Sequence, residues 1–208
     1  MVASMSDALR NGLTELGIEY SEYQLQQLMA YQNILLKWNK VFSLTAIKNH
    51  VDALTYHLLD GLSVVKYFSN AKNILDVGSG MGVPGVILAI MCPESNVVVI
   101  DSNSKKTAFL LQVKIELGLQ NLQIISKRVE DYQPAELFSI ITSRAFANLN
   151  LFVQLTHHLL ASDGKYLAMK SELGLSEVDQ VADFDNKIIT LIVPNLDAQR
   201  YLIEMTHK

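Results

Sequence analysis

The sequence has one cysteine and no apolar run that could cross a membrane, and these absences narrow its class. Cys92 alone, among 208 residues, excludes an intramolecular disulfide and a cysteine-rich zinc site. The stretch 77–93 is uncharged, but its glycines and prolines rule it out as a membrane helix. The first residues lack the basic and apolar segments of a secretory signal. We expect a soluble, reduced, cytoplasmic protein with no membrane association and no metal site.

Positive charge is also in short supply. The formal net charge is -4, so any binding to nucleic acid must come from a local basic patch. Hydrophobic residues make up 50% of the chain, which is enough for a substantial core. A length of 208 residues predicts one full α/β domain with a modest extension.

The spacing of hydrophobic residues differs between two consecutive regions of the chain. Residues 1–70 predict a helical extension packed on the core, with Ser6 as a cap, a capping box at 21–24 and a third helix over 51–68. From residue 71 to 208, strand and helix patterns alternate, which predicts a mostly parallel sheet with helices on both faces. Strands are expected at 74–77, 97–101, 122–126, 138–142 and 166–170, and helices at 84–91, 104–117, 148–160 and 172–182.

The end of the chain predicts a change in strand direction. The last two strands, at 187–193 and 201–206, lie too close together for a crossover and should pair as an antiparallel hairpin. A parallel sheet that ends in such a hairpin favours the methyltransferase version of an open α/β fold over the dehydrogenase version.

The most informative stretch runs from Ile74 to Gly85, where an apolar strand breaks into a glycine-rich loop before an apolar helix. Glycines there permit positive φ and let a ligand approach the backbone closely. The segment 80–85 also matches G-x-G-x-x-G, a weak dinucleotide signal when it stands alone. Asp76 before the loop and Asp101 at the end of the next strand are sharper features, and together they look like the S-adenosyl-L-methionine site of class I methyltransferases. In that site the second acid binds the ribose hydroxyls, as in dinucleotide folds.

Basic residues follow the carboxyl ends of the expected strands, where ligands of open α/β sheets bind. They are Lys105, Lys106, Lys127, Arg128, Arg144 and Lys170. This basic rim favours a polyanion as substrate, although a solvated mixed surface is the alternative. Phe146 would either stack on a base or pack its loop against the core.

Several motifs occur in one order along the chain: Trp38-Asn-Lys40 with Leu44-Thr45, His57-Leu-Leu-Asp60, the glycine loop, Leu117-Gly-Leu119, Arg128-Val-Glu130 and Ser143-Arg-Ala-Phe-Ala147. In these motifs the chain resembles the bacterial small-subunit ribosomal RNA methyltransferase G family, also called glucose-inhibited division protein B. The resemblance implies a class I, Rossmann-like methyltransferase fold. It also implies methylation of guanine N7 in the decoding-region loop of 16S rRNA, with S-adenosyl-L-methionine as donor and S-adenosyl-L-homocysteine as product.

The resemblance also implies roles for individual residues. The expected cofactor-binding residues are Asp76, Gly78, Ser79, Gly80, Gly82, Val83, Asp101, Ser102, Val129, Glu130 and Arg144. The expected RNA-binding residues are Lys105, Lys106, Arg128, Arg144, Phe146 and Lys170. Arg144 is the expected catalytic residue at the mouth of the site, with a structural pairing to Asp76 or Glu130 as the alternative. The partner would be 16S rRNA, the small ribosomal subunit or its assembly intermediate, and the chain is expected to be a monomer.

Three positions depart from the family pattern. Gly61 replaces a usual serine, Thr55-Tyr56 replaces a usually basic approach to His57, and Ser171 replaces a common glycine. His57 and Asp60 are expected as a solvated pair on their helix, although both could reach the site.

Guanine N7 carries a free lone pair, so the proposed chemistry needs no general base. Three alternative hypotheses for the function remain. They are a nucleotide-dependent oxidoreductase, a methyltransferase for protein or small molecules, and a non-catalytic module that binds S-adenosyl-L-methionine.

Overall fold

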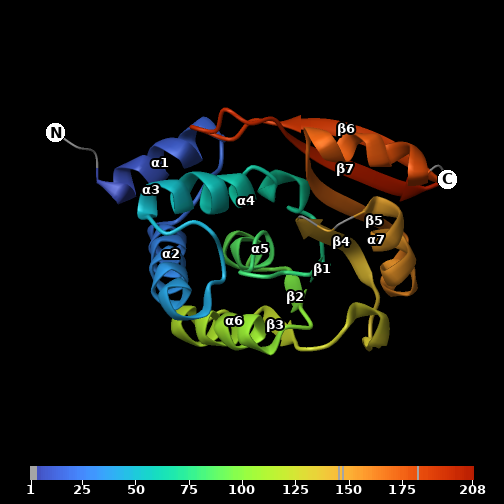
Figure 1. Ribbon diagram of the computed structural model, residues 1–208, viewed down its shortest axis with the longest axis horizontal. Coiled ribbons are helices and arrows are strands. Elements are labelled where there is room, and N and C mark those ends of the chain that lie inside the picture. Colours follow the sequence, from blue (N-terminus) through green and yellow to red (C-terminus); the bar gives the residue numbers. More distant parts are fainter. Residues whose placement is uncertain (1–3, 145, 147, 182) are drawn as a thin grey trace.

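A seven-stranded sheet, in the order β3-β2-β1-β4-β5-β7-β6, runs through the centre of the molecule (Figure 1). The structure is a computed structural model that describes residues 4–144, 146, 148–181 and 183–208. Its strands are β1 (Asn73–Val77), β2 (Asn96–Ile100), β3 (Leu122–Ile125), β4 (Phe138–Arg144), β5 (Leu160–Ser171), β6 (Phe184–Leu191) and β7 (Arg200–His207). Strands β1 to β5 are parallel, and β7 pairs antiparallel with both β5 and β6. The parallel sheet and its terminal hairpin are therefore confirmed.

The sheet is covered on both faces because alternate strand residues point to opposite sides. Ile74 and Val97 belong to a core shared with α5 (Gly85–Met91), α6 (Ser104–Leu117) and the N-terminal helices. Leu75 and Val98 point the other way, into a second core around α7 (Leu149–Thr156). This two-sided burial explains why the strands read as continuous apolar runs.

Helices fill the first third of the chain, but they are more broken than the sequence suggests. They are α1 (Met5–Glu15), α2 (Glu22–Phe42), α3 (His50–Ala53), a π-helical turn (Leu54–Leu59), α4 (Asp60–Leu62) and a 3-10 turn (Val65–Tyr67). The capping box of α2 is confirmed, since Ser21 Oγ accepts from the Gln24 N–H and Gln24 Oε1 accepts from the Ser21 N–H. The prediction that Ser6 caps α1 is wrong, because Ser4 has that role. The predicted third helix over 51–68 is helical over 50–62, but it changes from α to π and back, and only a 3-10 turn follows it.

Side chains from these helices reach the glycine loop and α6. Tyr31 on α2 is buried and donates its hydroxyl to the Met81 carbonyl at 2.7 Å. Trp38, near the end of α2, stacks edge-on against Phe109 of α6. The N-terminal helices and the sheet therefore share one apolar core.

Several element boundaries in the second half differ from the prediction, among them the end of α7 at Thr156 and the start of β6 at Phe184. Strands β4 and β5 both extend further than expected, and Asn103 caps α6 in place of Ser104. The predicted helix over 172–182 is a 3-10 helix, η5 (Glu172–Val181), and Ala182 lies outside the described residues, as do Ala145 and Ala147 of the Ser143–Ala147 motif. Among the described residues no helix is both long and apolar enough to cross a membrane.

Gly61 shows why one departure from the family pattern suits this chain. A Cβ atom there would overlap Ile87 Cδ1 and lie 3.0 Å from Val83 Cγ1. We expect Gly61→Ser to lower the free energy of unfolding by about 1–3 kcal/mol through overpacking, measured by urea denaturation.

The double variant Gly61→Ser/Ile87→Val supplies the control, because Ile87→Val removes the overlapping atom. In a double-mutant cycle the two changes should together cost less than their sum. Strictly additive costs would show that this contact is not the source of the strain.

Candidate active site

The glycine loop follows β1 and is held from inside by a buried carboxylate. Gly78, Gly80 and Gly82 have φ of 66°, 59° and 94°, a region that favours glycine. Asp76 has 0% exposure, and its Oδ2 accepts from the Ser79 Oγ at 2.6 Å and the Gly85 N–H at 3.0 Å. Burial raises the pKa of Asp76 to about 6, and the two hydrogen bonds oppose that rise.

Three of the residues expected to contact the cofactor have buried side chains. Asp76 and Ser79 face each other beneath the loop, and the Val83 side chain is buried beside Gly61. These positions show that the side chains hold the loop, and their direct contact with the cofactor stays a prediction. Gly80 contributes its N–H to Asp101, and Gly82 packs against Val86.

Beside the loop, the end of β2 opens a cavity of about 190 Å³. Its walls bring together five of the expected cofactor residues: Gly78, Asp101, Ser102, Val129 and Glu130. Asp101 Oδ2 accepts from the Gly80 N–H at 3.0 Å, and Oδ1 accepts from the Asn103 N–H at 2.9 Å.

The donors and walls of this cavity suit an adenosine. A carboxylate has about four acceptor positions, so Asp101 keeps capacity for ribose hydroxyls. Val77, Val129 and Leu155 supply apolar walls for a flat ring. The residues present therefore fit S-adenosyl-L-methionine. Among the described residues no cluster of His, Cys, Asp or Glu is arranged to hold a metal ion.

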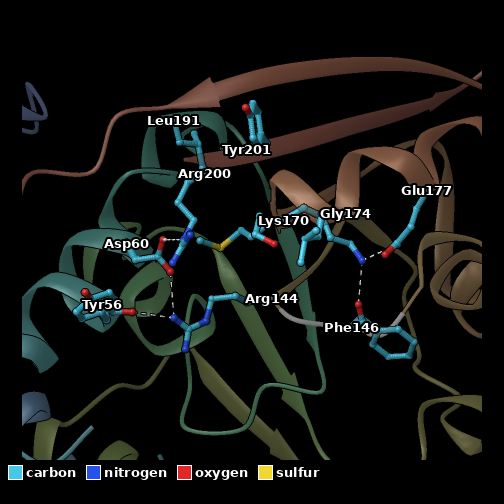
Figure 2. Close-up of a pocket in the computed structure, with 13 residues that line it drawn as sticks. Tyr56, Asp60, Arg144, Phe146, Lys170, Gly174, Glu177, Leu191, Arg200 and Tyr201 are labelled. Carbon is cyan, nitrogen blue, oxygen red and sulfur yellow. Dashed lines mark hydrogen bonds and ion pairs between the residues drawn. The ribbon is translucent and has the colours of Figure 1, made fainter. Parts of the chain in front are cut away.

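A second cavity, of about 540 Å³, lies over the ends of β4, β5 and β7 (Figure 2). Arg144, Lys170 and Arg200 all contribute to its walls. Phe146 lines both this cavity and the first cavity, beside the glycine loop. Its ring centroid lies 5.4 Å from that of Phe152. The two cavities therefore share one aromatic wall.

Arg144, at the end of β4, is fixed by the N-terminal helices. Its Nη1 donates to Asp60 Oδ2 and to the Tyr56 carbonyl, both at 3.0 Å, as Figure 2 shows. Among the described residues, its Nη2 makes one polar contact, at 3.8 Å with Met81 Sδ. The predicted alternative, a pairing with Asp76 or Glu130, is wrong: the partner comes from the π-helical turn and α4. Single π turns are frequent at functional sites.

Asp60 binds a second arginine that the sequence did not single out. Asp60 is only 3% exposed, and its Oδ1 lies 3.3 Å from Arg200 Nε without a well-aligned hydrogen bond. Arg200 opens β7 and pairs in register with Ser171 at the end of β5. The sequence predicts the hairpin, but not that β7 would lie next to β5 and bring this residue to the site.

His57 and Asp60 are buried, so their expected solvated pairing is wrong. His57 Nε2 bonds Thr45 Oγ1 at 3.0 Å and Nδ1 bonds the Tyr56 carbonyl at 2.9 Å. Burial, with a smaller effect from Arg144, lowers the pKa of His57 to about 4. The imidazole is therefore neutral and acts as part of the support for Arg144.

Lys170 is an inner part of the cavity wall. It is 8% exposed, and its Nζ donates to Glu177 at 2.7 Å and to the Phe146 carbonyl at 2.9 Å. A Cβ on Gly174 would lie 2.7 to 3.0 Å from carbon atoms of the Lys170 side chain. The absence of a side chain at Gly174 therefore leaves room for the aliphatic part of Lys170. Lys170 is therefore a paired cation in the wall of this cavity, and its role on the RNA side stays a prediction.

The other rim cations are also largely paired. Lys106 lies 3.5 Å from Asp101, and Arg128 lies 3.6 Å from Glu130. Of the six rim cations, only Lys105 and Lys127 have no acidic partner within the described parts of the chain. The rim is therefore less positive than the sequence suggests.

Comparison with known proteins gives a consistent picture. The family model described as rRNA small subunit methyltransferase G matches residues 24–202. The ribosomal RNA small subunit methyltransferase G of Chromobacterium violaceum is 45% identical, covering 95% of this chain and 95% of its own. That of Ectopseudomonas mendocina is 47% identical, covering 95% of this chain and 94% of its own.

Solved structures at low identity support the fold. A SAM-dependent methyltransferase from Aquifex aeolicus has a TM-score of 0.59 at 15% identity, covering 74% of this chain and 92% of that one. A structure described as a DhpI–SAH complex has a TM-score of 0.59 at 11% identity, covering 91% and 99%. Both share the class I methyltransferase fold with this chain.

The raised pKa of Asp76 predicts how stability depends on pH. From the ordinary value of 3.8 up to about 6, the folded protein holds a proton that the unfolded chain has lost, so stability falls as pH rises through this window. Asp76→Asn keeps both hydrogen-bond acceptor contacts and removes the titration. We expect the unfolding free energy of the variant, relative to wild type, to rise by about 2–3 kcal/mol between the two ends of the window.

Urea denaturation across this pH range measures the effect. Asp163→Asn, which changes an exposed carboxylate outside the glycine loop, serves as the control and should not reproduce the change. Parallel pH curves for wild type and Asp76→Asn would contradict the expectation.

Proposed function

The chain belongs to the rRNA small subunit methyltransferase G family, and from this premise we propose that it transfers a methyl group from S-adenosyl-L-methionine to N7 of a guanine in 16S rRNA. One observation carries the assignment of the site: an acid-lined cavity and an arginine-lined cavity meet at Phe146. The first suits a nucleoside with free ribose hydroxyls, and the second is wide enough for a purine. The shared wall sets donor and acceptor side by side.

In the first cavity, Asp101 would accept the ribose hydroxyls, and Val129 and Glu130 would flank the adenine. Lys106 Nζ lies 3.5 Å from Asp101 Oδ2 and forms an ion pair with this acceptor. Bound there, S-adenosyl-L-methionine would supply an electrophilic methyl group on a cationic sulfur.

In the second cavity, the residues have an orienting task. The lone pair of guanine N7 forms the new bond as the sulfur–carbon bond breaks, so no proton has to leave. His57 agrees with this, since it is buried and bonded at both nitrogens and is not poised as a base. Holding the reacting atoms in line can supply up to about 7–11 kcal/mol of the barrier.

Arg144 is the residue best placed to orient the base. Asp60 and Tyr56 fix Nη1, while Nη2 keeps donors for guanine O6 or a neighbouring phosphate. Because the guanidinium is held on one side, the other side presents its donors in a fixed direction.

Transfer of tritiated methyl groups tests the proposed function. Purified protein would be offered 16S rRNA, small subunits, assembly intermediates and total protein, each lacking the modification. We expect label in rRNA, and chain cleavage specific to N7-methylguanine at one position. Label in protein, or calorimetric binding of NADH without binding of S-adenosyl-L-methionine, would contradict the proposal.

Arg144→Lys tests the orienting role. Lysine keeps the charge but cannot bond Asp60, the Tyr56 carbonyl and a substrate at once, so we expect kcat/KM for RNA to fall roughly 10- to 100-fold. Affinity for S-adenosyl-L-homocysteine, measured by calorimetry, should stay unchanged. Arg10→Lys, at the exposed pair with Glu22 outside both cavities, is the matched control. Methylation at the wild-type rate by Arg144→Lys would remove Arg144 from the orienting role.

A further inference from the structure

Most of the rim cations that the sequence predicts as RNA-binding residues are paired with carboxylates and are not free to bind phosphates. Four of the six rim cations are bound to carboxylates, and Lys170 is buried as well. Binding to nucleic acid draws on cations that can replace the counterions of phosphates. The N-terminal helices carry cations of this kind.

A stretch without any acid lies at the end of α2 and in the loop that follows. Between Glu22 and Asp52 the chain has three lysines, Lys37, Lys40 and Lys48, and no Asp or Glu. All three are exposed, and none has an acidic partner within the described residues.

Apolar side chains stand among these lysines. Val41 is 73% exposed and Phe42 is 42% exposed at the end of α2, where the Phe42 ring lies 5.0 Å from that of Trp38. We call Lys37, Lys40, Val41, Phe42 and Lys48 the extension surface. Exposed aromatic and aliphatic groups among cations suit bases and sugars, which offer apolar faces between phosphates.

Helix α2, which carries most of the extension surface, packs against α6, which carries Lys105. Helices α2 and α6 run antiparallel, because Gln27 bonds the Leu117 carbonyl while Trp38 stacks on Phe109. Lys105 lies in the first turn of α6 and is one of the two rim lysines that have no acidic partner among the described residues. In Figure 1 the two helices lie against each other at the lower left.

The loop that carries Lys48 is tied down on both sides. The Asn39 side chain accepts from the Thr45 N–H and donates to the Ile47 carbonyl, each at 2.8 Å. Thr45 Oγ1 in turn bonds His57, beside the Tyr56 carbonyl that holds Arg144. Residues of the Trp38-Asn-Lys40 and Leu44-Thr45 motifs therefore connect this surface to the site, through the hydrogen bonds of Asn39 and Thr45.

We propose that the extension surface is an RNA-binding surface that contacts phosphates of the substrate outside the target guanine. The proposal rests on the proposed function for the identity of the polyanion. Three lysines without neighbouring acids complement an RNA backbone, and the connection through Thr45 and His57 sets that backbone at a fixed position relative to Arg144. The salt-dependent part of RNA affinity would then come mainly from the N-terminal helices.

The triple variant Lys37→Gln/Lys40→Gln/Lys48→Gln tests this. RNA binding would be measured by filter retention over a range of potassium chloride concentrations, with 16S rRNA as the probe. The slope of log affinity against log salt should fall by roughly 0.7 to 0.9 for each phosphate that a lysine no longer neutralises, or about 2 to 3 in all. KM for RNA should rise, while kcat at saturating RNA and affinity for S-adenosyl-L-homocysteine stay unchanged.

The control is Lys66→Gln/Lys72→Gln/Lys187→Gln, which removes three exposed lysines that also lack acidic partners in the described part of the chain. A wild-type slope in the first variant, or an equal fall in the control, would overturn the extension surface. Failure of the wild type to methylate any rRNA would instead overturn the proposed function. The two failures are therefore distinguishable.

Discussion

A carboxylate with no exposed surface fixes the shape of the loop on which the site depends. Asp76 lies in β1 with β2 on one side and β4 on the other, so its position is set by the sheet. Through one oxygen it holds Ser79 and the first residue of α5. Gly85 must be glycine there, because a Cβ would lie 2.7 Å from that oxygen. Burial of this carboxyl group is unfavourable, but it lets Asp76 hold the loop from the inner side. The outer side of the loop therefore remains available to a ligand.

A second buried carboxylate joins the N-terminal helices to the sheet. Asp60 lies between Arg144 of β4 and Arg200 of β7, and removal of one partner from such a pair typically costs about 3–5 kcal/mol. Neither arginine would have a fixed direction without the helices. The helical extension is therefore part of the site's construction, and the second cavity exists only where the two regions meet.

The sequence predicts features that depend on near neighbours. The capping box at Ser21, the glycine loop and the strand pattern all follow from local chemistry, and the structure contains them. The partners of the charges could not be predicted in this way. Asp60 and Arg144 are far apart in the chain, and the contact of Arg200 requires β7 to lie between β5 and β6. The irregular helix over 50–62 also cannot be predicted from residue spacing, because its apolar residues keep helical spacing while the backbone changes from α to π.

The pairing of the rim cations separates two tasks that a single basic patch would combine. A cation held by a buried carboxylate, such as Arg144, loses little further freedom when it binds, and its direction is set before the substrate arrives. It therefore contributes orientation more than attraction. An exposed lysine such as Lys40, which no described carboxylate holds, has no fixed direction, but it can displace counterions from a phosphate. Because these two kinds of cation lie on different elements, orientation of the base can be changed without a change in salt-dependent attraction, and the reverse also holds.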